Sequence, residues 1–334
     1  MKAYLVHEYG EAAKFTAAEI ETPTIKPGHV LIEVKATSIN PVDHKILTTP
    51  DMGINPELPA ILHMDVAGRV IETGAGVHNF KVGDEVYGCA GGLQGPTGKI
   101  DGALAEYMLA DANLIAHKPA SLSFAEAAAL PLVSITAWEG LFDRAKIQKG
   151  DQVLIHGGAG GVGHIALQLA KSCGAEVSVT VSNEAKAEIA KDMGADHVIN
   201  YKTEAVQEYV QRLTGGTGFD VVYDTVGADN LDKSFEAVRT SGQVISIIGQ
   251  NMHDLTPMHL KGLSLHLVFM LLPMLTGTGR AHHRDILREV AGLVEAGKVR
   301  PLLNAQRFGF DQINEAHDLF VSGQYMGKIV LEAR

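Results

Sequence analysis

The chain has 334 residues, of which 46% are hydrophobic and 20% are charged, and its formal net charge is −11. This length and composition predict a globular protein of two domains, and the acidic balance argues against a nucleic-acid partner. Two cysteines are too few for a disulfide framework, and we expect a cytoplasmic protein. The longest apolar stretch, residues 263–275, contains a histidine and a proline and is too short to span a bilayer, so no membrane association is expected.

The first part of the chain, residues 1–124, alternates like a β-rich domain. Its expected strands lie at residues 30–35, 66–72, 84–87 and 103–108. Short strands separated by turn signals predict an antiparallel barrel or sandwich. Residues 89–102 are rich in glycine and predict a flexible loop, a candidate lid.

Helical patterns follow in residues 122–146. An alanine-rich helix is expected at 125–130, with Ser123 as its cap and Pro131 as its breaker, and a second helix at 135–145.

From about residue 151 the pattern alternates between strands and helices. The expected strands lie at residues 152–156, 176–181, 197–200, 219–224, 243–248 and 265–270. This alternation predicts a parallel, doubly wound sheet. The rest of the chain predicts a helix at 284–296, an extended segment at 299–303, a helix at 312–322 and a final strand at 328–331.

A glycine-rich turn follows the first of these strands directly. Its register, Gly158-x-Gly160-x-x-Gly163, is a complete dinucleotide-binding motif, and residues 165–171 continue it as an amphipathic helix. In such a turn one glycine permits the bend, one lets the backbone approach a pyrophosphate, and one lets the helix pack close to the strand. The free N–H groups of Gly161 and Val162 are expected to bind the phosphates at the positive end of the helix dipole.

The end of the second strand indicates which dinucleotide binds. An NAD site usually has Asp or Glu there, about 20 residues after the motif, to bind the ribose 2′-hydroxyl. This chain has Ser182 instead, with Lys186 one helical turn later. Tyr201, after the third strand, is a candidate to stack on the adenine or bind the phosphate. The pattern favours NADP(H), although Lys186 taken alone is also compatible with a solvated helix face.

Several segments together resemble the medium-chain dehydrogenase/reductase superfamily, and most closely its zinc-free quinone oxidoreductase branch, the zeta-crystallin-like proteins. The resemblance covers essentially the whole chain. It is carried by Ser38-Ile39-Asn40-Pro41-Val42-Asp43, Asp65-Val66-Ala67-Gly68, residues 82–88, the glycine-rich turn, residues 194–201 and Gly327-Lys328-Ile329-Val330-Leu331.

The resemblance implies an α/β protein built from a GroES-like β-barrel catalytic domain and a Rossmann cofactor domain. The expected catalytic domain comprises residues 1–124 and 272–334, and the expected NADP-binding domain comprises residues 125–271. The resemblance also implies a cleft between these domains and a homodimer formed through the last Rossmann strand, residues 264–270.

The resemblance further assigns candidate site residues. Asn40 is expected to bind the nicotinamide ribose or the substrate carbonyl. Asp43 is expected to position the site or to make a purely structural hydrogen bond, and His63 to line the cleft or pack under it. The remaining candidates for cofactor contact are Thr136, Val226, Gly249, Phe269 and Met270 around the nicotinamide, and Lys328 at a cofactor phosphate.

The zinc ligands of the superfamily's alcohol dehydrogenases are not matched. By motif alignment the first ligand position is Asn40, the histidine position is Met64, and no cysteine lies near 130–136. Catalytic zinc needs three suitable protein ligands and an open position, so we expect no bound metal.

A site without metal favours hydride transfer to an electron-poor C=C bond or quinone. The leading hypothesis is an NADPH-dependent, zinc-independent reductase of quinones or α,β-unsaturated carbonyl compounds. An alcohol dehydrogenase with an unusual metal and a non-catalytic NADPH-binding protein, of the kind this family supplies to eye lenses, remain alternatives.

Overall fold

The computed structural model describes residues 1–333, and the chain forms two compact units. Unit 1 comprises Met1–Leu132, Leu271–Gly297 and the segment from Pro301 onward, and unit 2 comprises Val133–Met270 and Lys298–Arg300. Unit 1 continues past residue 124, where the sequence predicts the first domain boundary, because helix α2 (Phe124–Ala128) packs on strands of unit 1.

Unit 1 is built around antiparallel β-structure. A three-stranded sheet has the order β2-β1-β4, and a larger sheet has the order β10-β6-β5-β3-β18-β17, with β9 also paired to β3. The strands are β1 (Lys2–Val6), β2 (Thr16–Glu19), β3 (His29–Ser38), β4 (Ala60–Ile61), β5 (Asp65–Thr73), β6 (Glu85–Cys89), β9 (Tyr107–Asp111), β10 (Ile115–His117), β17 (Phe308–Gly309) and β18 (Val330–Glu332).

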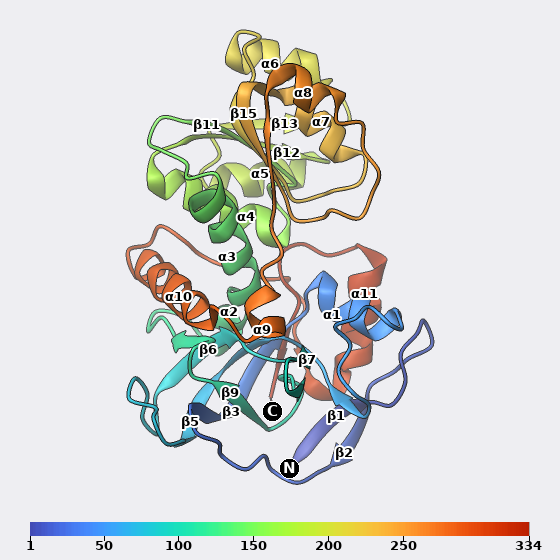
Figure 1. Cartoon of the computed structure of the whole chain (residues 1–334), viewed down its shortest axis with the longest axis vertical. Helices are drawn as coiled ribbons and strands as arrows, with labels where there is room; N and C mark the ends of the chain where they lie inside the picture. Colours follow the sequence, from blue (N-terminus) through green and yellow to red (C-terminus); the bar gives the residue numbers. More distant parts are fainter. Residues whose placement is uncertain (334) are drawn as a thin grey trace. The chain divides into compact units, whose positions relative to one another are not determined.

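The end of the chain returns to the sheet that its beginning forms. Strand β18 pairs antiparallel with β3, with Val330 opposite Ser38, and this pairing places the red C-terminal segment among the blue strands in Figure 1. The helices of unit 1 are α1 (Pro41–Thr48), α2, α9 (Leu272–Thr276), α10 (Arg280–Glu295), the 3₁₀ turn η2 (Phe310–Gln312) and α11 (Ile313–Ser322). Helix α11 lies beside α1 in Figure 1.

Unit 2 is a parallel sheet with the order β13-β12-β11-β14-β15-β16. Its strands are β11 (Gln152–His156), β12 (Glu176–Val181), β13 (His197–Asn200), β14 (Phe219–Asp224), β15 (Val238–Ser246) and β16 (Ser264–Leu267). Its helices are α3 (Pro131–Trp138), the π-helix η1 (Glu139–Arg144), α4 (Gly161–Cys173), α5 (Glu184–Asp192), α6 (Val206–Thr214), α7 (Asn230–Ala237) and α8 (Thr256–Lys261). The inner strands β11, β12 and β14 are mostly buried and apolar because helices cover both faces of such a sheet, whereas the edge strands β13 and β16 are more exposed.

Five local expectations were wrong. The strand expected at residues 103–108 lies later, at Tyr107–Asp111 (β9). Pro131 begins helix α3 instead of only ending the preceding one, since a proline is well tolerated in a first helical turn. The segment 299–303 makes only an isolated bridge between Leu303 and Lys328. The glycine-rich loop at 89–102 contains a hairpin of β7 (Leu93–Gly95) and β8 (Gly98–Ile100). The last strand of the parallel sheet ends at Leu267, three residues earlier than expected.

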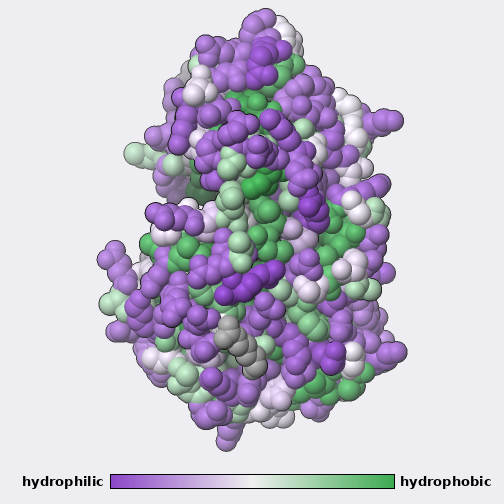
Figure 2. Space-filling model, turned by 180° about the vertical axis from the view of Figure 1, so that it is seen from behind, coloured by the Kyte–Doolittle hydropathy of each residue, from purple (hydrophilic) through white to green (hydrophobic). Residues whose placement is uncertain are grey.

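The face seen in Figure 2 is mostly hydrophilic, with several smaller apolar patches. Within residues 1–333, no helix is long and apolar enough to cross a membrane.

Candidate active site

Asn40 stands where strand β3 ends and helix α1 begins. Pro41 occupies the first helical turn, and the backbone N–H of Asn40 donates to Oδ2 of Asp43 at 2.8 Å. This pattern of Asn, Pro and Asp is a helix-start signal in the sequence. The cap fixes the backbone of Asn40, so the direction of its amide is set by the strand end and not by a mobile loop.

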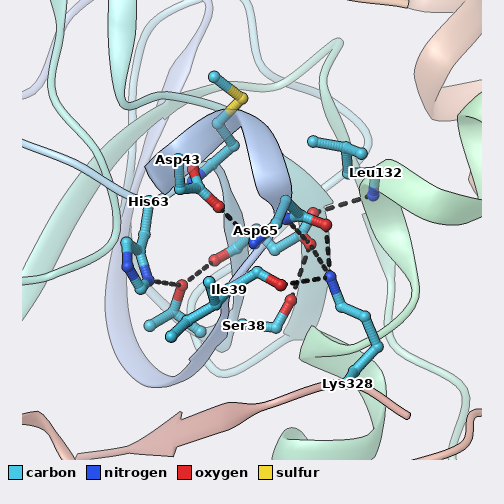
Figure 3. A network of polar contacts seen from close by, with 10 residues as sticks. Ser38, Ile39, Asp43, His63, Asp65, Leu132 and Lys328 are labelled. Carbon is cyan, nitrogen blue, oxygen red and sulfur yellow. Dashed lines mark hydrogen bonds and ion pairs between the residues drawn. The ribbon is translucent and has the colours of Figure 1, made fainter. Parts of the chain in front are cut away.

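The Asn40 amide is held on both sides by buried charges. Its Nδ2 donates to Oδ2 of Asp65 at 2.7 Å, and its Oδ1 accepts from Nζ of Lys328. Lys328 also donates to the carbonyl of Ile39 at 2.9 Å and lies 3.7 Å from Asp65 Oδ2 (Figure 3). An ammonium group only donates hydrogen bonds, so it fixes the amide oxygen towards Lys328 and the NH₂ group towards Asp65.

Asp65 collects donors from three parts of unit 1. Besides Asn40, Ser38 Oγ donates to Oδ2 at 2.9 Å and the backbone N–H of Leu132 donates to Oδ1 at 2.9 Å (Figure 3). Burial raises the pKa of Asp65, while Lys328 and these donors lower it. Because so many donors face both oxygens, we assign Asp65 as the ionised partner of Lys328.

Asp43 is a second buried carboxyl close to this pair. It accepts from the backbone N–H of Asn40 and, at 3.1 Å, from that of Met64. The pKa of Asp43 is raised to about 7, chiefly by burial and then by the charge of Asp65, against the opposing effects of the hydrogen bond from Asn40 and of Lys328. Both carboxyl oxygens of Asp43 hold backbone groups, which supports a positioning role.

This arrangement uses one of the two N–H donors of the Asn40 amide, whose side chain is fully buried in this structure. An amide NH₂ carries two N–H donors, and among the described residues only Asp65 accepts from that of Asn40. The second N–H suits an acceptor such as a carbonyl oxygen.

His63 belongs to a different chain of contacts. Its backbone has φ 71°, in the left-handed region where non-glycine residues are uncommon, and its side chain is fully buried. Its Nδ1 lies 3.4 Å from Oγ1 of Thr37, and its Nε2 lies 3.0 Å from Nε2 of His317 on α11. Nδ1 of His317 lies 3.2 Å from Nδ1 of His44 on α1, so three imidazoles form a row.

The row has one consistent assignment of protons. The Thr37 hydroxyl donates to the carbonyl of Asp65 at 2.6 Å, so it accepts from Nδ1–H of His63. His63 Nε2 then accepts from His317 Nε2–H, and His317 Nδ1 accepts from His44 Nδ1–H. All three imidazoles are neutral in this arrangement, and burial lowers the pKa of each of them. His63 therefore contacts the Asn40 network only through Thr37.

The glycine-rich turn of unit 2 has the geometry that a pyrophosphate requires. A Cβ atom on Gly158 would lie 2.5 Å from Cβ of Val179, and one on Gly163 would lie 2.1 Å from the carbonyl oxygen of Gly157. Helix α4 starts at Gly161 with no side-chain cap on its N-terminus. The first N–H groups, including that of Val162, are thus left for an anion, and the residues present fit a dinucleotide.

Ser182, Lys186 and Tyr201 lie at the carboxyl edge of the same sheet. Ser182 follows β12, Lys186 lies in the first turn of α5, and Tyr201 follows β13. The backbone N–H of Tyr201 donates to the carbonyl of Val181 at 3.2 Å, so the two strand ends are adjacent. Tyr201 is 51% exposed, which leaves its ring accessible to a ligand.

The other predicted cofactor residues lie in unit 2, apart from Lys328, which lies in unit 1. Thr136 is buried on α3, Val226 follows β14, and Gly249 follows β15 with Leu267 beside it. Phe269 and Met270 follow β16 outside any strand. Lys328 has its ammonium on Asp65 and Asn40, so we place its role there and not at a cofactor phosphate.

Sequence reasoning gave no role to several residues of the site. Asp65 was noted only as part of a family segment, and Thr37, His44 and His317 were not noted at all. Asp65 begins a strand directly after His63 and Met64, which is a weak signal. The meeting of histidines 273 residues apart has no signal in one sequence.

The residues at the two matched zinc-ligand positions of the superfamily's alcohol dehydrogenases, Asn40 and Met64, make other contacts in this structure. Asn40 is engaged with Asp65 and Lys328, and Met64 is fully buried with its N–H on Asp43. Within residues 1–333, no group of three or more His, Cys, Asp or Glu side chains could hold a metal ion.

Two protein-family models match the chain. The alcohol dehydrogenase GroES-like domain matches residues 26–120, and the zinc-binding dehydrogenase domain matches residues 161–282. The chain is 35% identical over 99% of its length to the 2-methylene-furan-3-one reductase of Solanum lycopersicum, and covers 79% of that protein. It is 33% identical over 99% of its length to the chloroplastic NADPH-dependent alkenal/one oxidoreductase of Arabidopsis thaliana, and again covers 79% of it.

A solved structure agrees with these matches. The Escherichia coli quinone oxidoreductase complexed with NADPH superposes with a TM-score of 0.85, at 28% identity, over 99% of this chain and 100% of that one. The chain belongs to the medium-chain dehydrogenase/reductase superfamily. The predicted superfamily and the predicted fold class, a GroES-like domain with a Rossmann domain, are confirmed.

Proposed function

We propose that this protein is an NADPH-dependent, zinc-independent oxidoreductase that transfers a hydride to a quinone or to an α,β-unsaturated carbonyl compound. The observation that carries the proposal is the Asn40 amide, held by Lys328 and Asp65 with one N–H left for an acceptor. It stands at the first zinc-ligand position of the superfamily's alcohol dehydrogenases, where it offers a hydrogen bond and not a metal ligand. The named activities of the alkenal, furanone and quinone reductases support the same chemistry.

In this proposal each residue of the site has a distinct role in binding the cofactor or the substrate. Bound NADPH supplies the hydride. The N-terminus of α4 holds the pyrophosphate, and Ser182 and Lys186 hold the 2′-phosphate. The Asn40 amide donates to the carbonyl oxygen of the substrate as negative charge develops there. Lys328 keeps that amide from turning its oxygen towards the substrate, Asp43 holds its backbone, and solvent supplies the proton.

The test is NADPH consumption with a simple quinone and with a simple enone, on protein whose metal content has been measured. We expect turnover of at least one acceptor and no stoichiometric zinc. One tightly bound zinc per chain together with alcohol oxidation would establish an alcohol dehydrogenase instead. NADPH binding without turnover of either acceptor would favour a non-catalytic protein.

We further propose that the protein is a homodimer formed through β16, the edge strand of the parallel sheet. We also propose a cytoplasmic location, although the Arabidopsis thaliana relative is a chloroplastic protein.

A further inference from the structure

Three buried polar residues form a row across the parallel sheet of unit 2. They are the paired residues Thr180 on β12, His156 on β11 and Asp224 on β14. Residues at paired positions of neighbouring parallel strands project on the same side of the sheet. Each of the three is at most 2% exposed. Burying a polar side chain in the centre of such a sheet costs free energy unless hydrogen bonds compensate, so a row of three is unusual.

The row lies under the point where the strand order reverses. The sheet runs outward from β11 in one direction and from β14 in the other, so His156 and Asp224 end the two strands that flank this point. Ligands of doubly wound sheets bind outside the strand ends at such a point. The turn that follows His156 is the glycine-rich turn, and a Cβ on Gly157 would lie 2.9 Å from Oγ1 of Thr225 in the turn that follows Asp224.

Each end of the row holds one of these turns. Thr180 Oγ1 accepts from the backbone N–H of Gly157 at 3.1 Å, at the start of the glycine-rich turn. Asp224 Oδ1 accepts from the backbone N–H groups of Val226 and Gly227, both at 3.0 Å. The two turns are thus fixed by side chains that do not touch each other, with His156 between them.

The contacts of His156 determine its tautomer. Its Nδ1 lies 3.2 Å from Oγ1 of Thr180, whose hydroxyl hydrogen remains available after the oxygen accepts from Gly157. In the tautomer that uses this hydrogen, the hydroxyl donates to Nδ1 and the imidazole proton is on Nε2, and we adopt this tautomer. His156 Nε2 and Asp224 Oδ2 are both buried, and neither has a hydrogen-bond partner in residues 1–333. The two residues are paired on adjacent strands, and burial lowers the pKa of His156 while the charge of Asp224 acts on the imidazole in the opposite direction.

We propose that His156 is a positioning residue for the cofactor, which couples the glycine-rich turn to the turn at Val226 through Thr180 and Asp224. This inference rests on the proposed NADPH-dependent function. His156 makes no contact with the reacting atoms in this proposal; it sets the relative placement of two phosphate- and nicotinamide-binding turns.

The experiment is a double-mutant cycle on NADPH affinity, measured by fluorescence titration without turnover. Thr180→Val removes the hydroxyl at nearly constant shape, with Thr180→Ser as the matched control that keeps it. Asp224→Asn puts an NH₂ group in place of one carboxylate oxygen. We expect each of Thr180→Val and Asp224→Asn to raise the Kd by about tenfold, Thr180→Ser to leave it nearly unchanged, and kcat to change much less than KM.

The coupling between the two changes decides the proposal. The two residues are separated by a whole strand, and the side chain that lies between them is His156. Thr225 also links the two turns, because its Oγ1 donates to the His156 carbonyl at 2.6 Å, so the coupling carried by the imidazole is the part that disappears in a His156→Phe background. We expect the Kd for NADPH in the double variant to rise clearly less than the product of the two single increases. In a His156→Phe background we expect the two increases to multiply. Multiplicative losses with His156 present would overturn the inference, and this arm needs no change at His156. Failure of wild-type protein to bind NADPH would instead refute the proposed function.

Discussion

His63 and His317 are 254 residues apart in the chain, and their Nε2 atoms lie 3.0 Å apart. A separation this short requires that one nitrogen carries a proton and the other does not. Charging His63 would place a second proton in this contact, and charging His317 would place one on the Nδ1 that accepts from His44. Through His44 the same row ties the C-terminal helix α11 to the start of α1. The histidines therefore make the attachment of α11 sensitive to acid.

The first prediction concerns stability against pH. Burial lowers the pKa of His317 from 6.5 to about 3, with smaller effects from His44 and Lys14. The stability contributed by neutral His317 is complete above the unfolded pKa and is lost as the pH falls towards the folded one. At about pH 5 this group alone should cost about 2 kcal/mol of unfolding free energy relative to about pH 8. Urea unfolding at both pH values should show a smaller loss in His317→Phe than in wild type.

Two comparisons make this measurement specific. His78 is exposed, so His78→Phe should keep the wild-type loss. Asp43, with its pKa raised to about 7, acts with the opposite sign in the same range, because its protonated form is favoured in the folded state. Asp43 is present in both proteins, so its contribution to the pH dependence cancels when His317→Phe is compared with wild type. An unchanged pH dependence in His317→Phe would contradict the neutral row.

The second prediction concerns the Asn40 amide. Asn40→Ala should lower kcat/KM for a quinone or enone by roughly a hundredfold, because it removes the proposed donor to the developing negative charge. Ser38→Ala is the matched control, since it removes one hydrogen bond to the same Asp65 carboxylate without touching the amide. Steady-state kinetics of both variants separate the two roles. Equal losses would mean that the effect comes through Asp65 and not through the amide.

The third prediction concerns the choice of cofactor. Lys186→Ala should weaken NADPH binding by about tenfold to a hundredfold, because a charge-assisted contact to the 2′-phosphate is lost, and should leave NADH almost unchanged. Ser182→Asp should repel the phosphate and favour NADH. The KM for both cofactors in wild type and in each variant is the measurement. A wild-type preference for NADH, or an equal loss of both cofactors in Lys186→Ala, would show that the phosphate site is misplaced.

The fourth prediction concerns assembly. Strand β16 is an edge strand, and Leu267 at its end is 53% exposed. Leu267→Lys should convert a dimer into a monomer in sedimentation at micromolar concentration, because a charge on the edge opposes pairing. Leu260→Lys on neighbouring α8, where Leu260 is 77% exposed, is the matched control and should remain dimeric. A wild-type monomer would refute the proposed interface, and NADPH binding by the variant would show that Leu267→Lys leaves the cofactor site intact.

The sequence by itself determined the parts of this protein that depend on local backbone rules. The glycine-rich turn was predictable because a Cβ at Gly158 or Gly163 has no room, and the inner parallel strands β11, β12 and β14 were predictable because most of their residues are buried and apolar. The absence of an acid after β12 is likewise visible in a short window of sequence.

Only the tertiary structure decided which distant side chains meet. Lys328 was expected at a cofactor phosphate, but the pairing of β18 with β3 places it on Asp65 and Asn40. The histidine row and the row across β12, β11 and β14 depend on strand and helix neighbours that are far apart in the chain. Local propensity carries no information about such pairings, because they are selected by the packing of the whole domain.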